Sequence, residues 1–288
     1  MGTWLLRIAA GSLALAGCVA HTVNLTAPDG PRFEGRYAAA AKQRVPEERR
    51  LRVVSFNIKL ARQIDRAITV LESPELRAAD VIALQEMDDA GVERIARTLS
   101  LNYVYFPGAI HPTEGRYFGP AILTPWPIDS AWKLVLPHRG SQRGQRRTAT
   151  AAILEVEGRP VRVYAVHLEN QTRVTRAEHR DQAAAVLADA AHAEEPVIVA
   201  GDFNSHEIGR YFARHGYEWP TANVGRTVAL FSWDHIFAKG LVPAGPGGAV
   251  KEVLGASDHR PVWAALRLGP AASAISAPAS PAGSSPPR

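Results

Sequence analysis

The sequence predicts an α/β fold in which two packed β-sheets form the core and helices cover the outside. Expected strands outnumber expected helices, and antiparallel pairs occur beside strand–helix units. Of the 288 residues, 46% are apolar and 21% are charged, which is typical of a globular protein and excludes a mainly disordered chain, a collagen or a coiled coil. The net charge of +5 suits an anionic substrate, but it suits many other proteins too.

The first half of the expected domain alternates short apolar strands with helices. Residues 51–58 (LRVVSFNI) are rich in β-branched residues and predict a buried strand, and residues 81–84 predict a second one. Helical segments are expected at 61–72 and 90–99. Glycine and proline separate the next strand candidates, which are 103–106, 121–124 and 128–136.

A hairpin and a long helix are expected in the second half. Residues 148–156 and 161–167 predict two strands joined by a turn at 157–160. The alanine-rich segment 173–193 predicts a helix. Residues 139–147 (RGSQRGQRR) contain four arginines and no acidic residue, and they predict a loop. Further strands are expected at 197–200, 234–238 and 261–268.

The first residues of the chain have the pattern of an export signal. Arg7 precedes a short apolar run, 8–15, that falls well below the roughly 20 residues needed to cross a bilayer. The run LAGC at 15–18 resembles the bacterial lipobox, which implies a signal peptide at 1–17 and a lipid on Cys18. Cys18 is the only cysteine, so no internal disulfide can form. A plain secretory signal followed by an unrelated cysteine is the alternative.

The remaining segments outside the domain are polar or of low complexity. Residues 18–50 are expected to be a tether, and 270–288, rich in Pro, Ala and Ser, to be disordered. The folded domain is therefore expected at 51–269. Val19 and Ala20 after the cysteine resemble outer-membrane sorting patterns. We therefore expect a lipid-anchored monomer in the bacterial cell envelope, at the periplasmic face of the outer membrane.

Six segments place polar residues where an apolar strand ends or begins. A carboxylate at such a position costs free energy unless it has a partner or an ion, so six of them predict one convergent polar cleft. Carboxylate and amide oxygens without a cysteine suit Mg²⁺, or Mn²⁺, better than zinc. The segments, in chain order, are SFN (55–57), LQE (84–86), VHLEN (166–170), GDFN (201–204), WDHIF (233–237) and SDHRPV (257–262).

Each feature has an ordinary explanation when it is taken alone. An asparagine after a strand, such as Asn57, is usually a turn residue. An Asp-His pair such as Asp258-His259 often occurs by chance. Arg146 and Arg147 fit a solvated loop more often than a substrate clamp, although we expect both to bind the substrate. The six segments together, in this order within one domain, are hard to attribute to chance.

The ordered set resembles the endonuclease/exonuclease/phosphatase superfamily, the deoxyribonuclease I-like metal-dependent hydrolases, over about residues 51–268. GDFN and the downstream SDH are its most specific parts. The resemblance implies a four-layer αββα sandwich with two mixed sheets between layers of helices. It also implies a Mg²⁺ site in which Glu86 is the main ligand and Asn57 and Asp258 support it.

The catalytic residues follow from the same resemblance. His259 would act on the attacking water or on the phosphate, and Asp234 would orient it. Asp202 and Asn204 would position the nucleophile and the scissile phosphate. His167 would lie on the phosphate side, and Asn170 in the same segment would contact the substrate.

Some residues depart from the family pattern. Gly119-Pro120-Ala121 stands where relatives often have Gly-Asn-Ala, and Trp233 and His235 around the aspartate are atypical. These departures concern substrate specificity rather than the hydrolytic core.

We therefore expect a Mg²⁺-dependent phosphoesterase that hydrolyses phosphodiesters. A catalytically inactive binding lipoprotein on the same fold, or a phosphomonoesterase acting on sugar, inositol or lipid phosphates, are the alternatives. Nucleic acid, phospholipid and small phosphate esters all remain open as substrates. The arginines of 139–147, with Arg173, Arg176 and Arg180, suit a nuclease groove. A lipid anchor instead favours a substrate at the membrane.

Overall fold

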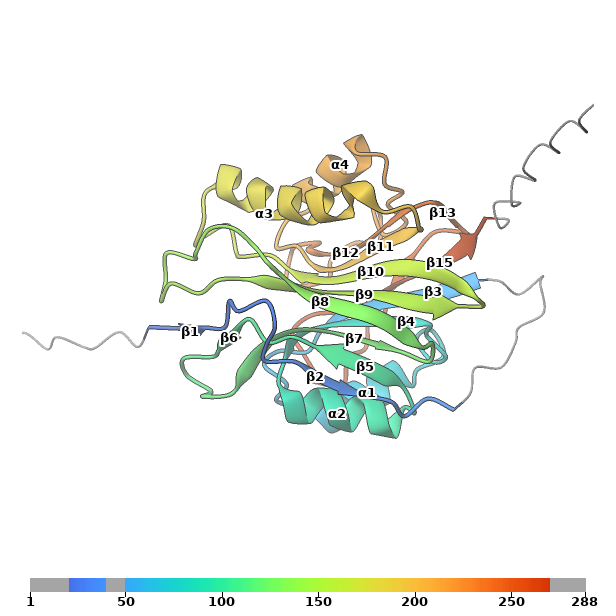
Figure 1. Cartoon of the computed structure of the whole chain (residues 1–288), viewed down its shortest axis with the longest axis horizontal. Helices are drawn as coiled ribbons and strands as arrows, with labels where there is room; N and C mark the ends of the chain where they lie inside the picture. The colour runs from blue at the N-terminus through green and yellow to red at the C-terminus, as the bar shows by residue number, and fades with distance from the viewer. Residues whose placement is uncertain (1–20, 40–49, 270–288) are drawn as a thin grey trace, which may run out of the picture.

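Two β-sheets pack face to face, and a pair of helices covers the outer face of each sheet (Figure 1). The computed structural model describes residues 21–39 and 50–269, and the expected signal peptide, Cys18 and tail 270–288 lie outside them. The four layers confirm the expected αββα sandwich. Within the described residues, no helix is long and apolar enough to cross a membrane.

The first sheet has ten strands and mixes parallel with antiparallel pairs. Its main path runs β1-β6-β7-β4-β3-β15-β13, with β2, β5 and β14 attached at its sides. β3 and β4 are parallel, and β15 lies antiparallel to β3 on its other side. The strands are β1 (Val23–Asn24), β2 (Phe33–Gly35), β3 (Arg50–Asn57), β4 (Val81–Met87), β5 (Asn102–Tyr105), β6 (Ala109–Ile110), β7 (Tyr117–Thr124), β13 (Leu241–Pro243), β14 (Gly248–Ala249) and β15 (Val262–Leu268).

The second sheet has five strands in the order β12-β11-β10-β9-β8. The predicted hairpin is confirmed, and its turn is tighter than expected. Only Glu157 and Gly158 connect the strands, with φ of 52° and 74°, the positive values that a two-residue hairpin turn requires. The strands are β8 (Ile128–Val135), β9 (Thr148–Val156), β10 (Arg159–His167), β11 (Val197–Asp202) and β12 (Asp234–Lys239).

Apolar side chains fill the space between the sheets. Val53, Ile122, Val163 and Ile236 are fully buried members of this core, and they come from both sheets. The burial of such side chains contributes roughly 1.5–3 kcal/mol each. β10 and β11 approach so closely that a Cβ on Gly201 would lie 2.0 Å from the Val166 carbonyl oxygen. A glycine is therefore required directly before Asp202.

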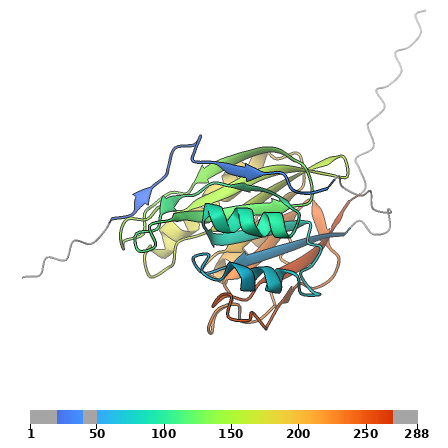
Figure 2. The same ribbon diagram turned by 90° about the horizontal axis from the view of Figure 1, so that it is seen from below.

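The helices form the two outer layers. α1 (Ile64–Leu71) and α2 (Asp89–Thr98) lie side by side on the first sheet, as Figure 2 shows from below. α3 (Arg176–Asp189) and α4 (Glu207–Arg214) cover the second sheet. A capping box between Thr175 and Glu178 starts α3, three residues later than expected. α4 is only eight residues long and was not expected.

Part of the segment expected as a tether belongs to the first sheet instead. Within residues 21–39, β1 pairs with β6 and β2 pairs with β5. The buried Lys133 ammonium donates to the carbonyl oxygens of Leu25 and Gly30 at 2.9 and 2.7 Å. The folded unit therefore begins well before residue 51. Pairing between residues 68 to 87 positions apart leaves no local sequence pattern that would reveal it.

Candidate active site

The site forms where the strands of both sheets end. β3 and β4 are parallel and end near Asn57 and Glu86, while β10 and β11 are parallel and end at His167 and Asp202. β12 runs antiparallel to β11, so its first residue, Asp234, lies in register with Asp202. The predicted convergence of strand-end residues is therefore present in the structure.

The Asp202 carboxylate is the central group of the site. Its Oδ2 accepts a hydrogen bond of 3.0 Å from Asn57 Nδ2 and lies 3.5 Å from His167 Nε2 and 3.8 Å from His259 Nε2. Its Oδ1 accepts the Asn204 backbone N–H at 2.9 Å. The pKa of Asp202 is raised to about 7, chiefly by burial; the His259 charge lowers this pKa and the Asp234 charge raises it.

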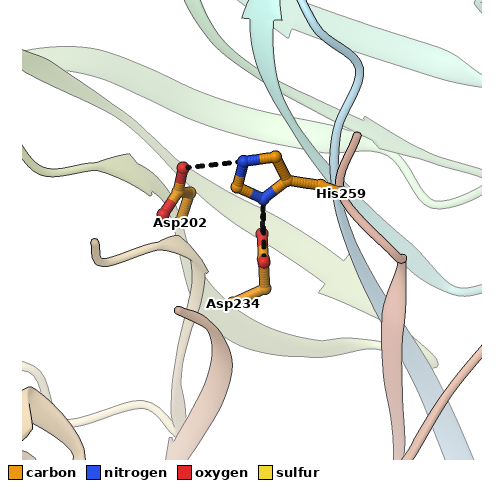
Figure 3. Close-up of side chains that lie close together, drawn as sticks. All are labelled: Asp202, Asp234 and His259. Atoms are coloured by element: carbon orange, nitrogen blue, oxygen red, sulfur yellow. Dashed lines mark hydrogen bonds and ion pairs between the residues drawn. The ribbon is translucent and has the colours of Figure 1, made fainter. Parts of the chain in front are cut away.

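His259 and Asp234 form a buried dyad beside that carboxylate (Figure 3). His259 Nδ1 lies 2.9 and 3.2 Å from the two Asp234 oxygens, so its N–H donates to the carboxylate. Burial opposes the charge on the imidazole. The Asp234 and Asp202 carboxylates outweigh that effect and raise the pKa of His259 to about 10.

His167 has the opposite kind of partner. Arg147 Nη1 lies 3.1 Å from His167 Nδ1, and because a guanidinium can only donate, Nδ1 accepts and the proton sits on Nε2. Burial and the Arg147 charge hold the pKa of His167 well below its usual range. His167 is therefore a neutral imidazole whose Nε2–H points toward Asp202 Oδ2.

A buried ion pair supports this second histidine. Arg147 Nη2 donates to Glu169 Oε1 at 2.9 Å, and Glu169 is fully buried. A Cβ on Gly140 would lie 2.7 Å from Glu169 Oε2, so the loop backbone closes tightly over this carboxylate. The charged partner of the arginine loop thus comes from the VHLEN segment. The sequence contains Glu169, but nothing in the local pattern shows that it faces the loop.

Arg146 and Arg147, both expected to bind the substrate, have different surroundings. Arg147 is buried and also lies over the Phe118 ring, 5.5 Å from its centroid. Arg146 is half-buried, and its Nη1 donates to the Leu136 carbonyl at 3.3 Å. Its backbone N–H donates to Asn24 Oδ1 at 2.7 Å, which ties the loop to β1. In this structure both guanidinium groups bind protein atoms.

Glu86 lies at an irregular end of β4. Its φ is 60°, a left-handed conformation that is unusual for glutamate, and the pairing register with β7 shifts between Leu84 and Met87. Its Oε2 accepts the Leu60 N–H at 3.0 Å, and Asn57 Nδ2 lies 3.4 Å from Oε1. Strained backbone of this kind is common at functional sites.

Asp258, which was expected to help bind the metal, forms an ion pair with a lysine in the structure. Its Oδ2 pairs with Lys59 Nζ at 3.1 Å, and both side chains are about half exposed. The neighbouring Ser257 hydroxyl donates to the Asn57 carbonyl oxygen at 2.6 Å, so this segment still lies against the end of β3. Sequence reasoning did not identify Lys59 as a partner.

Asn204 and Asn170 form the outer edge of the site. Asn170 Nδ2 donates to Asn204 Oδ1 at 3.2 Å, and Asn204 Nδ2 donates to the Leu168 carbonyl at 3.0 Å. Asn204 has a φ of 50°, a conformation that asparagine tolerates better than most residues. These bonds join the VHLEN and GDFN segments into one rim.

Two sets of side chains offer ligand atoms for a cation. Ligand atoms of Asp202, Asp234 and His259 lie within 4.8 Å of one another. The raised pKa of His259 and its bond to Asp234 make that group a proton-bearing dyad rather than a free ligand set. The Glu86 carboxylate and the Asn57 amide oxygen are hard donors of the kind Mg²⁺ takes.

Comparison with known proteins finds a matching family profile and solved structures with a similar fold. A profile described as the Endonuclease/Exonuclease/phosphatase family matches residues 54–259. No curated protein sequence matches the chain. Similar solved structures include an endonuclease/exonuclease/phosphatase from Beutenbergia cavernae DSM 12333, with 22% identity over 77% of this chain and 72% of that one and a TM-score of 0.60.

Two further structures have similar scores. An endonuclease/exonuclease/phosphatase from Bacteroides vulgatus is 18% identical over 76% of this chain and 99% of its own, with a TM-score of 0.62. Sphingomyelinase C from Streptomyces griseocarneus is 18% identical over 75% of this chain and 99% of its own, with a TM-score of 0.57. At these identities the likeness shows the shared fold.

Proposed function

This chain belongs to the endonuclease/exonuclease/phosphatase family, and on that premise we propose that it hydrolyses phosphodiesters with the help of a bound divalent cation, Mg²⁺ or Mn²⁺. Members of the family are generally hydrolases of phosphate esters. The observation that carries the proposal is the convergence on Asp202 Oδ2 of an amide and two histidines. A site that only binds phosphate needs donors, and a buried carboxylate at its centre would repel the anion.

The donor chemistry fits a hard cation at Glu86. The Glu86 carboxylate supplies two oxygens, and Asp258 adds a carboxylate on the adjoining segment. Asn57 turns its Nδ2 toward Glu86 Oε1 and accepts the Lys59 N–H at Oδ1, so its amide would have to turn over to offer an oxygen to a cation there. Mg²⁺ characteristically takes one or two protein carboxylates and keeps several waters. Bound there, a cation would neutralise charge on the phosphate and polarise a water.

Asp202 and His259 carry out the proton transfers in the proposed reaction. Water attacks phosphorus, the ester P–O bond breaks, and the water proton passes to Asp202 Oδ2. The Nε2–H groups of His167 and His259 both face that oxygen and so lie beside the phosphate, where they donate to its developing negative charge. His259 can also release its Nε2 proton to the leaving oxygen, since Asp234 holds its Nδ1–H.

We extend the proposal to the cell envelope. The lipobox-like run at 15–18 supports a lipid on Cys18, with the domain held at the periplasmic face of the outer membrane. The test is fractionation of cells that express the full chain or Cys18→Ser. The protein should move from the membrane fraction to the soluble fraction on substitution, with its melting temperature unchanged. A wild-type chain found in the soluble fraction would refute the anchor.

The hydrolase function is tested with the purified chain and bis(p-nitrophenyl) phosphate under Mg²⁺ titration. Activity should vanish in EDTA and return with Mg²⁺ or Mn²⁺. Glu86→Gln keeps the shape of the side chain and removes its charge, so it should lower kcat by orders of magnitude and weaken the metal dependence while the protein stays folded. Glu93→Gln, on α2, is the matched control. EDTA-resistant turnover would contradict the proposal, and hydrolysis of p-nitrophenyl phosphate alone would indicate a monoesterase.

A further inference from the structure

A basic groove lies between the two helices that cover the second sheet. α3 and α4 contact one another on its outer face (Figure 1), and the hollow between them has a volume of about 330 Å³. Four arginines line it: Arg176 and Arg180 from α3, and Arg210 and Arg214 from α4. Glu207 is the only acidic residue among those lining it.

The positive charge of the groove is not neutralised within the protein. In residues 21–39 and 50–269, none of the four guanidinium groups forms an ion pair, and Arg180 contacts only the Tyr211 ring, at 6.0 Å from its centroid. Two acidic residues of α3 are engaged elsewhere, because Glu178 and Asp181 lie 3.7 and 2.9 Å from His138. The arginines therefore keep their full charge.

The spacing of the arginines sets each pair on one side of its helix. Arg176 and Arg180 are four residues apart, and so are Arg210 and Arg214, so each pair lies together on a helix face. Like charges at this spacing destabilise a helix by a few tenths of a kcal/mol. An anion held between the two pairs would remove that cost.

The groove reaches residues that adjoin the rim of the active site. Gln171 and Ser205 line it, and they directly follow Asn170 and Asn204, the two residues that form the rim of the site. His179 lies in its wall and donates from Nε2 to the Phe203 carbonyl at 2.8 Å, within the GDFN segment. A strand that passes this rim would therefore have the groove beside it.

We propose that this groove binds the phosphate backbone of a single-stranded nucleic acid whose scissile phosphate lies at Asp202. The inference rests on the phosphodiesterase function proposed above. Four unpaired arginines form a track for successive phosphates, and Tyr211 offers a ring on which a base can stack. Stacking on Tyr211 requires an unpaired base, which favours a single strand over a duplex.

The composition of the groove favours nucleic acid over a membrane surface. Surfaces that bind lipid combine basic residues with exposed large apolar ones. The exposed large hydrophobic residues of the described chain are Val23, Leu230, Phe231, Val242 and Leu254, and none of them lines the groove. The groove is also concave, whereas a bilayer presents a broad surface.

The test measures binding without hydrolysis. A fluorescently labelled oligothymidylate is titrated with the full chain in EDTA, at several salt concentrations. Two double variants, Arg176→Gln/Arg180→Gln and Arg210→Gln/Arg214→Gln, should each weaken binding about tenfold or more at low salt. Each should also reduce the slope of log K against log salt by about 1.4, since each lost phosphate contact removes about 0.7 on a single strand.

A charge-matched control separates the groove from net charge. Arg66→Gln/Arg77→Gln removes two exposed arginines on the side of the first sheet, and it should leave binding nearly unchanged. Turnover of bis(p-nitrophenyl) phosphate should stay within about twofold in all three variants, because that substrate does not reach the groove. Arg176→Lys/Arg180→Lys should restore most of the affinity.

Groove variants that bind the oligonucleotide as tightly as the control would overturn the proposal. Equal weakening in the control, or a loss of binding to phosphatidylglycerol vesicles with oligonucleotide binding intact, would overturn it as well. Different results would refute the hydrolase function and the groove. Groove-dependent binding in a chain that hydrolyses no diester would refute the hydrolase function alone, whereas diester turnover with no effect of the groove variants would refute the groove alone.

Discussion

The two histidines beside Asp202 lie in opposite electrostatic surroundings. His259 has a carboxylate behind it, Asp234, and its pKa rises to about 10. His167 has a guanidinium behind it, Arg147, and its pKa falls well below the usual range. Both present Nε2 toward the same carboxylate oxygen. The side chain behind each imidazole therefore decides whether that histidine carries an exchangeable charge or is a fixed neutral donor.

This difference divides the roles at the site. A histidine that gains and loses a proton can take part in acid–base chemistry, which contributes roughly 10²–10⁴-fold to the rate. A neutral histidine with one fixed tautomer can only donate its Nε2–H to the phosphate. Variants of the two histidines and of the residues behind them should therefore differ in their effects.

The largest effect is expected at the His259–Asp234 dyad. His259→Ala should lower kcat/KM by several orders of magnitude and Asp234→Asn somewhat less. The double variant should lose little more than His259→Ala alone, because residues acting as a unit give non-additive losses. Steady-state kinetics of the three variants, with melting temperatures, measure this. Fully additive losses would show that His259 and Asp234 do not act as a unit. A lowered melting temperature with near-normal activity for Asp234→Asn would show that Asp234 has only a structural role.

A smaller loss of kcat is expected when His167 is replaced, and a conservative substitution should restore part of it. His167→Ala removes one donor to the phosphate and should cost about 10²–10³ in kcat, the usual range for such a donor. His167→Gln keeps an N–H group and should recover about tenfold of that loss. His259→Gln should recover nothing, because an amide cannot carry the proton. Equal rescue at both positions would contradict the division of roles.

Arg147 is expected to affect stability before it affects activity. Arg147→Ala removes the hydrogen-bonded partner of the buried Glu169 charge and leaves only the more distant Arg173, at 3.7 Å, which costs about 3 kcal/mol in the free energy of unfolding. The double variant Arg147→Ala/Glu169→Gln should regain most of the lost free energy of unfolding. Urea denaturation of the single and the double variant measures this. Arg146→Ala is the control and should change stability by less than about 1 kcal/mol. If Arg147→Ala raised KM alone, with stability intact, Arg147 would be a substrate contact instead.

The metal-free protein should lose stability as the pH rises. The pKa of Asp202 is raised to about 7 and that of His259 to about 10, from unfolded values of about 3.9 and 6.5. Both groups bind more protons in the folded state as the pH rises through neutrality, which lowers stability. The buried His167 and His235, whose pKa values are lowered, act in the opposite sense below about pH 6.5, and Lys133, with a pKa lowered to about 8, does so above about pH 8. The decline is therefore expected between about pH 6.5 and 8. Melting curves in EDTA should show a fall of several degrees, and Mg²⁺ should flatten it. A melting temperature that rises over this range would contradict the assigned shifts.

The sequence was most informative where a functional residue directly follows a buried strand. Asn57, Glu86, His167 and Asp202 end apolar strands whose order and pairing bring them together, so their convergence was predictable. In each of these strands a mostly apolar, buried run precedes the functional residue and marks where the strand ends. The Gly201-Asp202 pair adds the close backbone approach that only glycine allows.

The remaining contacts depend on residues distant in sequence. The sequence of Arg147 fits a solvated loop, and only the fold places this side chain against Glu169. The ion pair between Asp258 and Lys59 likewise has no signal in the local sequence. Residues 21–39 read as a tether because β1 and β2 are too short to leave a periodic pattern. In each case the deciding interaction is tertiary, and no local propensity encodes it.

The central claim is tested most directly by the proton states of the two imidazoles. Nitrogen-15 NMR of histidine-labelled, metal-free protein, assigned with His167→Gln and His259→Gln, reports charge and tautomer for each ring. At pH 7 we expect His259 to carry protons on both nitrogens and His167 to be neutral with its proton on Nε2. A His167 that is charged at pH 7, or that carries its proton on Nδ1, would contradict the account.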